Sequence, residues 1–151
     1  PLPQAQWEWV DGPLDLLIFE GWCVGAAPQP DADLAEPVND LERAEDPGGI
    51  WRRAVNEALA GPYQALFGRI DRLVLLAAPG FDVVHGWRAQ QEAELRAALA
   101  AQRRDPALAM TDDQVARFIQ HYERITRAII AEMPARADLT LRLDRDRGVK
   151  T

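Results

Sequence analysis

The sequence predicts an α/β protein whose short apolar strands alternate with amphipathic helices around a mostly parallel sheet. Residues 14–19 and 73–78 are short, largely apolar runs bounded by turn-forming residues, which is typical of strands buried on both faces of such a sheet. Residues 139–143 alternate between apolar and polar side chains, which predicts a third strand. Three strands make a thinner sheet than the average of about five or six, so the pattern indicates part of a doubly wound domain.

A long segment with little apolar periodicity follows the first strand. Asp11-Gly12-Pro13 precede that strand, and Glu20-Gly21 end it. Residues 26–48 are rich in proline and acidic side chains, and we interpret them as an acidic surface loop with a short helical turn near Leu41. A loop of this length within a compact domain is usually functional or mobile.

Helical periodicity begins at Ile50. Apolar residues then repeat on one helical face until Gly61-Pro62 interrupts them. Proline is tolerated in a first helical turn, so a second short helix is expected to start there. The side chains expected to point inward are Ile50, Trp51, Ala54, Val55, Ala58 and Leu59 in the first helix, and Tyr63, Leu66 and Phe67 in the second.

Two longer helices are predicted between the second and third strands. The first covers residues 82–103 and has an apolar stripe that includes Trp87 and Leu99. The second begins after Thr111, whose hydroxyl forms a Thr-x-x-Gln capping box with Gln114. Its helical period continues until Pro134, which ends it.

The composition excludes several classes of protein. The chain has no serine, so it cannot carry a Ser-His-Asp triad, and its single cysteine, Cys23, excludes an internal disulfide and a cysteine-rich zinc module. His85 and His121 stand far apart and have no second ligand at zinc spacing. No apolar run approaches the ~20 residues of a membrane span, and no signal peptide opens the chain, so we expect a cytoplasmic protein without a membrane partner.

The charge is distributed unevenly along the chain. The first 50 residues hold eleven acidic side chains and one basic one, whereas the remaining 101 hold sixteen basic and thirteen acidic side chains. A nucleic-acid-binding domain needs a clustered basic surface, so the net charge of −7 argues against that partner. The later arginines remain compatible with a small phosphorylated ligand, because a guanidinium offers a planar fork of donors to phosphate oxygens.

Three groups of charged side chains are candidates for chemistry. Glu20 ends the first strand, where ligands of open α/β sheets bind, so it is placed either to hold Mg²⁺ or to cap the next loop or pair with an arginine. Arg88, Glu92 and Arg96 are spaced four apart, and they form either an exposed salt-bridge ladder or a helix whose arginines clamp phosphates. The same two interpretations apply to the pair of arginines after the last strand, Arg145 and Arg147.

Five separated motifs together resemble the glycerate kinase branch of the P-loop kinases, which is related to the uridine, pantothenate and phosphoribulose kinases. The first is Ile18-Phe19-Glu20-Gly21-Trp22-Cys23-Val24-Gly25, an apolar strand that ends in Glu-Gly-Trp with a glycine shortly after. The others lie at residues 38–41, 87–96, 110–122 and 143–147, in the order of the family. The resemblance extends over about residues 1–149.

The resemblance implies a P-loop NTPase-like fold and a chemistry. Such kinases transfer the γ-phosphoryl group of ATP to a hydroxyl of a small molecule, with Mg²⁺ as the metal. By position, Glu20 would be the acid at the magnesium and substrate site, and Arg88 and Arg96 would be catalytic lid residues that approach the phosphates. Residues 82–133 would then be the lid region and its packing helices.

The resemblance also implies binding residues. Trp22 and Asn39 would belong to the acceptor pocket, which the loop of residues 26–48 would flank. Arg147, with Arg145, would lie near the nucleotide base.

The sequence departs from the family pattern at one place. Members of the family begin with a strand and a Gly-rich loop ending in Lys-Ser or Lys-Thr, followed by a strand that bears a second acid, and neither occurs in these 151 residues. The resemblance places the missing P-loop strand between residues 14–19 and 73–78. We therefore expect residues 1–151 to be the carboxyl-terminal part of one kinase-like domain, inactive alone, with the missing segment supplied in cis or as a separate chain.

Two alternatives remain open at this point. Beside the glycerate-kinase-like kinase, the chain could be a non-catalytic α/β interaction domain that keeps the kinase outline, or a kinase of the same fold whose acceptor is a nucleoside or pantothenate.

Overall fold

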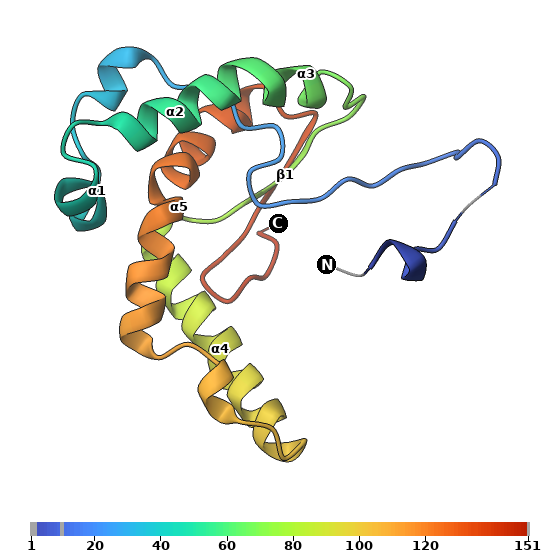
Figure 1. The fold of residues 1–151 in the computed structure, drawn as a ribbon. Coiled ribbons are helices and arrows are strands. Elements are labelled where there is room, and N and C mark those ends of the chain that lie inside the picture. Colours follow the sequence, from blue (N-terminus) through green and yellow to red (C-terminus); the bar gives the residue numbers. More distant parts are fainter. Residues whose placement is uncertain (1–2, 10, 151) are drawn as a thin grey trace.

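The computed structural model, which describes residues 3–9 and 11–150, contains five α-helices and a small parallel sheet (Figure 1). Strand β1 (Val74–Ala77) pairs in parallel with β2 (Leu139–Arg142), and Val74 stands opposite Leu139. These are the second and third strands expected from the sequence, and their parallel pairing is confirmed. The helices are α1 (Asp40–Glu45), α2 (Ile50–Ala58), α3 (Gln64–Phe67), α4 (Val84–Ala101) and α5 (Asp112–Glu132).

Short turns of 3₁₀ helix connect or extend these elements at five places. They are Gln4–Gln6, Asp31–Leu34, Phe81–Val83, Pro106–Leu108 and Met133–Ala135. No helix among residues 3–9 and 11–150 combines the length and the apolar character needed to cross a membrane.

Helices α4 and α5 form a pair that projects from the sheet and is joined at its far end (Figure 1). The capping box expected at the start of α5 is confirmed. Thr111 Oγ1 accepts a hydrogen bond from the Gln114 backbone N–H at 3.3 Å, and the Gln114 side chain accepts one from the Thr111 N–H at 2.8 Å. The predicted bounds of both long helices agree with the structure to within two residues.

The apolar core lies on one face of the sheet. Leu75 and Ala77 of β1 point into it and pack with Ile129 of α5 and the following Met133. On the opposite face, Val74 and Leu76 are 53% and 62% exposed. The prediction that β1 is buried on both faces is therefore wrong for the described residues, because no helix among them covers the second face.

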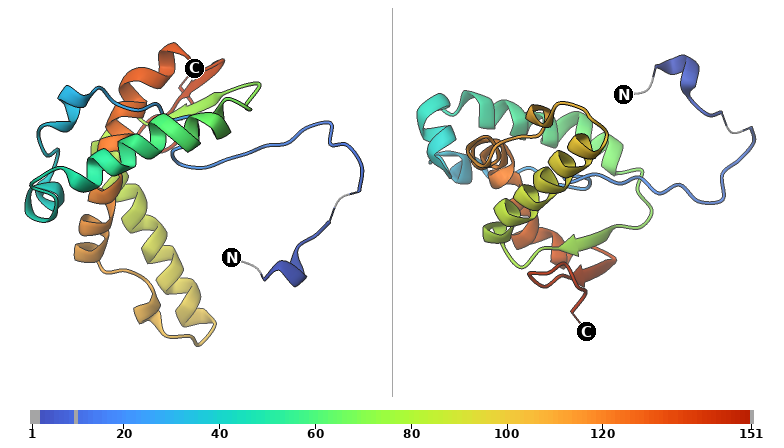
Figure 2. Two further views of the ribbon diagram at one scale, coloured as in Figure 1. Left: turned by 45° about the horizontal axis from the view of Figure 1, so that its top comes forward. Right: turned by 90° about the horizontal axis from the view of Figure 1, so that it is seen from below.

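Residues 14–19 do not form the strand that their sequence predicts. They run extended and away from the body of the molecule (Figures 1 and 2), and Leu16, Leu17 and Ile18 are each at least 75% exposed. A strand requires a hydrogen-bonded neighbour, and in the described part of the chain β1 is paired with β2 alone. The apolar run is present, but the strand it would pair with is not among these residues.

The break expected at Gly61-Pro62 is present as a kink within a π-helical turn, Leu59–Tyr63, that joins α2 to α3. Leu59 is buried, but Ile50 and Trp51 are each 74% exposed, so the inward face expected for α2 is only partly correct. Arg52, which is 5% exposed, takes the buried position instead. Phe67 of α3 packs on the core as expected, whereas Leu66 of α3 and Tyr63, the last residue of the π-helical turn, remain exposed.

Residues 26–48 are more ordered than the loop expected there. They contain the turn Asp31–Leu34 and helix α1, which includes the helical turn predicted near Leu41. Two buried arginines, Arg52 and Arg124, hold this segment, and we refer to them as the arginine brace.

The arginine brace binds four successive carbonyl groups. Arg52 donates to the Leu34 oxygen at 2.6 Å and to the Ala35 oxygen at 3.0 Å. Arg124 donates to the Asp33 oxygen at 2.7 Å and to the Glu36 oxygen at 2.7 Å. The carbonyl groups of this turn are thereby satisfied by side chains rather than by a helix or sheet.

Candidate functional site

A row of aromatic side chains connects the end of the N-terminal segment with α4. Trp22 meets Tyr122 of α5 edge-on, with 4.5 Å between ring centroids, and Tyr122 lies 4.9 Å from Phe118. The Arg88 guanidinium carbon lies 5.2 Å from the Phe118 centroid. The aromatic row of Trp22, Tyr122 and Phe118 thus brings the residue expected in the acceptor pocket and a residue expected in the lid to the same flank of α5.

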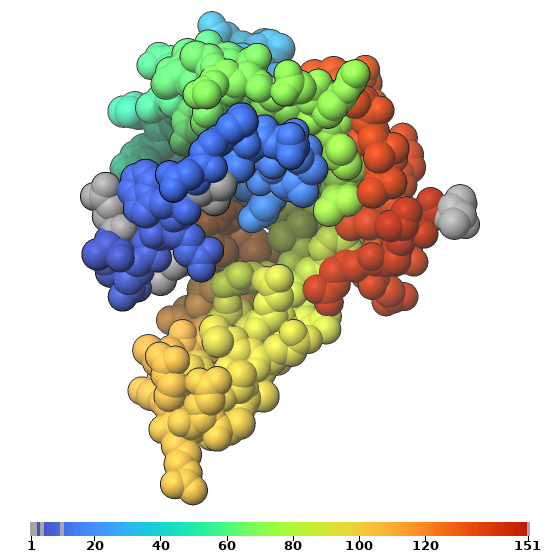
Figure 3. Space-filling view, turned by 90° about the vertical axis from the view of Figure 1, so that its right-hand side faces the viewer, coloured from blue at the N-terminus to red at the C-terminus, as the bar shows by residue number. Residues whose placement is uncertain are grey.

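An apolar hollow lies beside this row, at the carboxyl end of β1. Figure 3 shows the molecule recessed between its N-terminal segment and α4. Ligands of parallel sheets bind at this end of the strands, so the hollow has the position expected of a site. Its lining residues are Trp22, Leu75, Leu76, Ala77, Ala78, Val84, Trp87, Thr126, Ile129 and Ile130.

Arg88 and Arg96 both contact groups that link α4 to α5. Arg88 Nη2 donates to the carboxylate of Glu92, whose other oxygen accepts from the Met110 N–H at 2.8 Å. Arg96 Nη2 donates to the Met110 carbonyl at 2.7 Å. Because Glu92 is only 4% exposed, the four-residue spacing does not form the exposed ladder that was one of its two interpretations.

Arg145 and Arg147 lie in the turn after β2, which packs on the start of α4. Arg145 Nη2 donates to Asp82 at 2.6 Å, and the Trp87 indole N–H donates to the Arg145 carbonyl at 2.8 Å. The Arg147 guanidinium carbon lies 5.9 Å from the Trp87 centroid, and its Nη2 donates to Gln90. The structure therefore gathers both arginines around Trp87, next to Arg88 in the chain.

Asn39 and Glu20 lie outside the aromatic row. Asn39 Oδ1 caps α1 by accepting from the Glu42 N–H, and its amide donates to the Gln120 carbonyl, both at 2.9 Å. Glu20 is exposed at the end of the extended segment. Residues 3–9 and 11–150 contain no group of three His, Cys, Asp or Glu side chains able to hold a metal ion.

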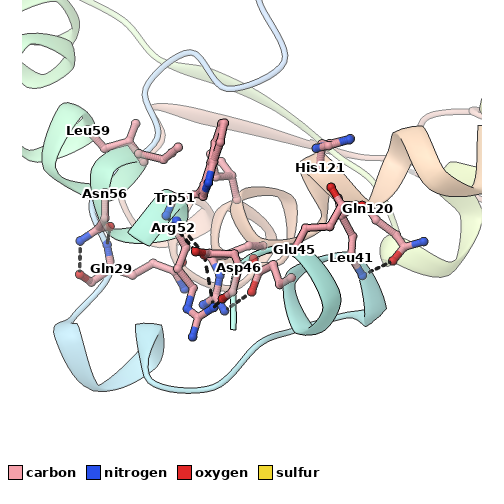
Figure 4. A pocket seen from close by; sticks show the side chains of 14 residues that line it. Gln29, Leu41, Glu45, Asp46, Trp51, Arg52, Asn56, Leu59, Gln120 and His121 are labelled. Atoms are coloured by element: carbon pink, nitrogen blue, oxygen red, sulfur yellow. Dashed lines mark hydrogen bonds and ion pairs between the residues drawn. The ribbon is translucent and has the colours of Figure 1, made fainter. Parts of the chain in front are cut away.

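A second pocket lies between α1, α2 and α5 (Figure 4). Both brace arginines line it, and their donors are directed to carboxylates and carbonyls of the chain itself. Asn56 and Gln29 at its edge exchange hydrogen bonds of 2.7 and 2.9 Å. None of the site residues expected from the sequence lines this pocket.

The carboxylates that bind the brace remain charged. Burial raises the pKa of Glu42. Hydrogen bonds from Arg124 and the Val38 N–H, together with the charge of Arg124, lower it by more than burial raises it, so the pKa lies below its usual value. Burial also raises the pKa of Asp46, and hydrogen bonds from the backbone of α2 with the charge of Arg52 lower it below its usual value. Two ion pairs therefore join residues 42–46 to α2 and α5.

Sequence reasoning missed the part that Glu92 plays. Its only signal is its position midway between Arg88 and Arg96, and this spacing is the same for an exposed and a buried carboxylate. The second contact of Glu92 is the backbone N–H of Met110, and a contact with the backbone cannot be predicted from residue types.

No family model and no solved structure matches the chain, whereas two curated proteins do. "Uncharacterized kinase mug58" of Schizosaccharomyces pombe is 36% identical over 107 residues, which are 70% of this chain and 35% of that protein. "D-glycerate 3-kinase, chloroplastic" of Arabidopsis thaliana is 30% identical over 152 residues, which are 95% of this chain and 29% of that protein. The chain thus spans about a third of the length of these relatives. It is homologous to part of the glycerate-kinase-like kinases, as the resemblance of its motifs indicates.

Proposed function

We propose that this chain forms the acceptor and lid part of an ATP-dependent kinase that phosphorylates a hydroxyl of a small, glycerate-like acid. The observation that carries the proposal is the aromatic row, which joins Trp22 to Arg88 beside the hollow at the carboxyl end of β1. The name of the plant relative, a D-glycerate 3-kinase, supports the choice of acceptor.

The proposed roles follow from what phosphoryl transfer requires. Its catalysis consists mainly of aligning the reacting groups and neutralising phosphate charge. Arg88 and Arg96 supply positive charge on the projecting helix pair, and Trp22 forms a wall of the acceptor pocket. Asn39 acts through α1, because its cap and its contact with α5 hold the segment that flanks the acceptor.

The nucleotide base is assigned to the surface around Trp87. Arg147 lies over the indole ring, and Arg145 is paired with Asp82 in the 3₁₀ turn that precedes α4. These planar groups suit the face of a base better than a phosphate, since the charge of Arg145 is already balanced.

The acidic segment would at first sight repel an acceptor that carries a carboxylate. In the structure, however, Arg124 neutralises Glu42 and Arg52 neutralises Asp46. The field that an anionic acceptor meets is therefore weaker than the sequence alone indicates, so the acidic segment does not count against an acceptor such as glycerate.

Mg²⁺ would accompany ATP in this proposal. The ion usually takes one or two carboxylates and completes its shell with substrate phosphates and water. Glu20 is the carboxylate that this chain would contribute, and bound Mg²⁺ would neutralise phosphate charge. The remaining ligands would come from ATP, from water and from residues outside the chain.

We further propose that the phosphate-binding loop is supplied by polypeptide outside these 151 residues. Three features support this: β1 has one unpaired edge among the described residues, its outer face exposes Val74 and Leu76, and residues 14–19 are extended and exposed. One further parallel strand, placed between residues 14–19 and β1, would pair with both, and a helix connected to such a strand would cover the exposed face of β1. The 151-residue chain alone would then bind no phosphates and would be inactive.

The proposal is tested by comparing the 16.8 kDa chain with a longer polypeptide that also carries a Gly-rich loop ending in Lys-Ser or Lys-Thr. Each is assayed with Mg-ATP and a panel of D-glycerate, pantothenate and uridine. We expect the longer polypeptide to phosphorylate D-glycerate and the chain alone to phosphorylate nothing.

Three outcomes would count against it. Full activity of the 16.8 kDa chain would disprove the external loop. Transfer to pantothenate or uridine alone would support the kinase with a different acceptor. A longer polypeptide that neither transfers phosphate nor gains thermal stability with Mg-ATP would support a non-catalytic interaction domain.

A further inference from the structure

Glu92 differs from the other acid of α4 in its surroundings. Glu94 is exposed and accepts a hydrogen bond from exposed Gln90, whereas Glu92 is 4% exposed. A carboxylate that is so buried is costly unless its oxygens are bonded. One oxygen binds Arg88 and the other accepts from the Met110 N–H, so the side chain is fixed in one orientation.

The second contact of Glu92 lies at the start of α5. Met110 directly precedes Thr111, the residue that caps this helix. Glu92 accepts a hydrogen bond from the Met110 N–H, and Arg96 donates one to the Met110 carbonyl. Two successive turns of α4 therefore bind the backbone of one residue. The position of α4 is thereby tied to the position at which α5 begins.

Arg88 is held by Glu92 but is not saturated. Phe118 lies under its guanidinium, Glu92 takes Nη2, and Nη1 donates to exposed Gln91 at 3.2 Å. Its Nε is buried and has no hydrogen-bond partner among the described residues. A buried donor without an acceptor is rare. The Arg88 side chain as a whole is 34% exposed, so another oxygen can reach the rest of the guanidinium.

We propose that Glu92 is a positioning residue of the lid: it orients Arg88 for the phosphates of ATP and couples that orientation to the junction of α4 with α5. The inference rests on the proposed function, because only a kinase gives Arg88 a phosphate to bind. Glu92 itself touches no substrate. Its carboxylate binds Nη2 and thereby fixes the orientation of the guanidinium, which reduces the ordering that phosphate binding would otherwise require.

A double-mutant cycle tests this role in the longer polypeptide that also carries the phosphate-binding loop. The variants are Glu92→Gln, Arg88→Ala and the double substitution, and kcat and the KM for the acceptor are measured for each. Glu94→Gln is the matched control, because it also removes one carboxylate from α4 but contacts only Gln90. Loss of a residue that orients another through a hydrogen bond typically costs about 10- to 100-fold. We expect Glu92→Gln to lower kcat about tenfold, with the acceptor KM little changed.

The decisive comparison is made in the Arg88→Ala background. If Glu92 acts through Arg88, Glu92→Gln causes no further loss of kcat there, since two residues that act as a unit are not additive. An equal tenfold loss in both backgrounds, or a loss no larger than that of Glu94→Gln, would overturn the inference. A full-length wild-type polypeptide without ATP-dependent transfer would instead overturn the proposed function, and the inference with it.

Glu92→Asp keeps the test open if Glu92→Gln does not fold. Aspartate retains the charge but is one methylene shorter, so it cannot reach Arg88 and Met110 together as glutamate does. We expect an intermediate loss of kcat that again disappears in the Arg88→Ala background. A loss that persists in that background would show that Glu92 supports the fold without positioning Arg88.

Discussion

Replacing Arg124 by methionine would remove one half of the arginine brace while keeping a side chain of similar length. Arg124 is 8% exposed, and its guanidinium makes a two-point contact with Glu42, at 2.8 Å from Nε and 2.7 Å from Nη2. It also donates to the carbonyls of Asp33 and Glu36. The substitution would leave a carboxylate that is 14% exposed without its counterion and two carbonyls without their donors.

The expected cost follows from what remains behind. Breaking a buried ion pair by removing one partner typically costs about 3–5 kcal/mol, because the other charge stays buried. Glu42 would keep its hydrogen bond from the Val38 N–H, so the lower limit applies and we expect a loss of about 3 kcal/mol. For an m-value of about 2 kcal/mol/M, this lowers the urea midpoint by about 1.5 M.

Urea unfolding of wild type and Arg124→Met, followed by circular dichroism at pH 7, measures this loss. Arg117→Met is the matched control, because Arg117 also lies on α5 and also makes a two-point contact with a glutamate of α1, Glu45. That pair is more than half exposed, and exposed pairs contribute little. Equal midpoint shifts for the two variants would refute the argument, since Arg124 differs from Arg117 in its burial and in its bonds to two backbone carbonyls.

Three further outcomes are expected. The free energy of unfolding should fall as the pH drops below about 4, because Glu42 and Asp46 have lower pKa values in the folded chain than in the unfolded chain, where they lie at about 4. The stability that these two carboxylates contribute above about pH 4 is lost as the pH falls through their folded-state pKa values. A melting temperature equal at pH 7 and pH 3 would contradict this. Thr111→Ala should lower the unfolding free energy by about 1 kcal/mol in urea titrations, because it removes the cap of α5, whereas Thr111→Ser should restore most of it. Leu76→Lys should leave the melting temperature of the chain nearly unchanged, since Leu76 is 62% exposed, but should abolish kinase activity of the longer polypeptide; retained activity would show that no segment covers this face.

The sequence predicted the elements whose signals are local. The bounds of α5 follow from a capping box at Thr111 and a proline at position 134, both of which act within a few residues. β1 was found because a short apolar run between turn residues is distinctive, and β2 because its residues alternate between apolar and polar. Trp22 and Arg88 were both identified from motifs, and the structure brings them to one flank of α5.

What the sequence did not predict depends on partners far along the chain. Residues 14–19 have the composition of a strand, but pairing depends on a neighbour that is not among the described residues. The inward face of α2 is determined by Arg52, because the carbonyls of Leu34 and Ala35 require its donors. A pattern of apolar residues cannot indicate that an arginine will be the most useful side chain to bury.

Arg124 and Arg88 differ in how many of their N–H donors are bonded to the chain itself. Every guanidinium nitrogen of Arg124 donates to a carboxylate or carbonyl of the chain, so Arg124 has little left to offer a ligand. Arg88 also binds a glutamate, yet its Nε has no partner and its Nη1 is engaged only by an exposed amide. Both pairs have nearly the same chemistry, and they differ in whether the protein consumes all the donors. An unused donor in a buried position is costly. The donors of Arg124 are therefore consumed by the fold, whereas Arg88 keeps donors for the phosphate contact proposed above.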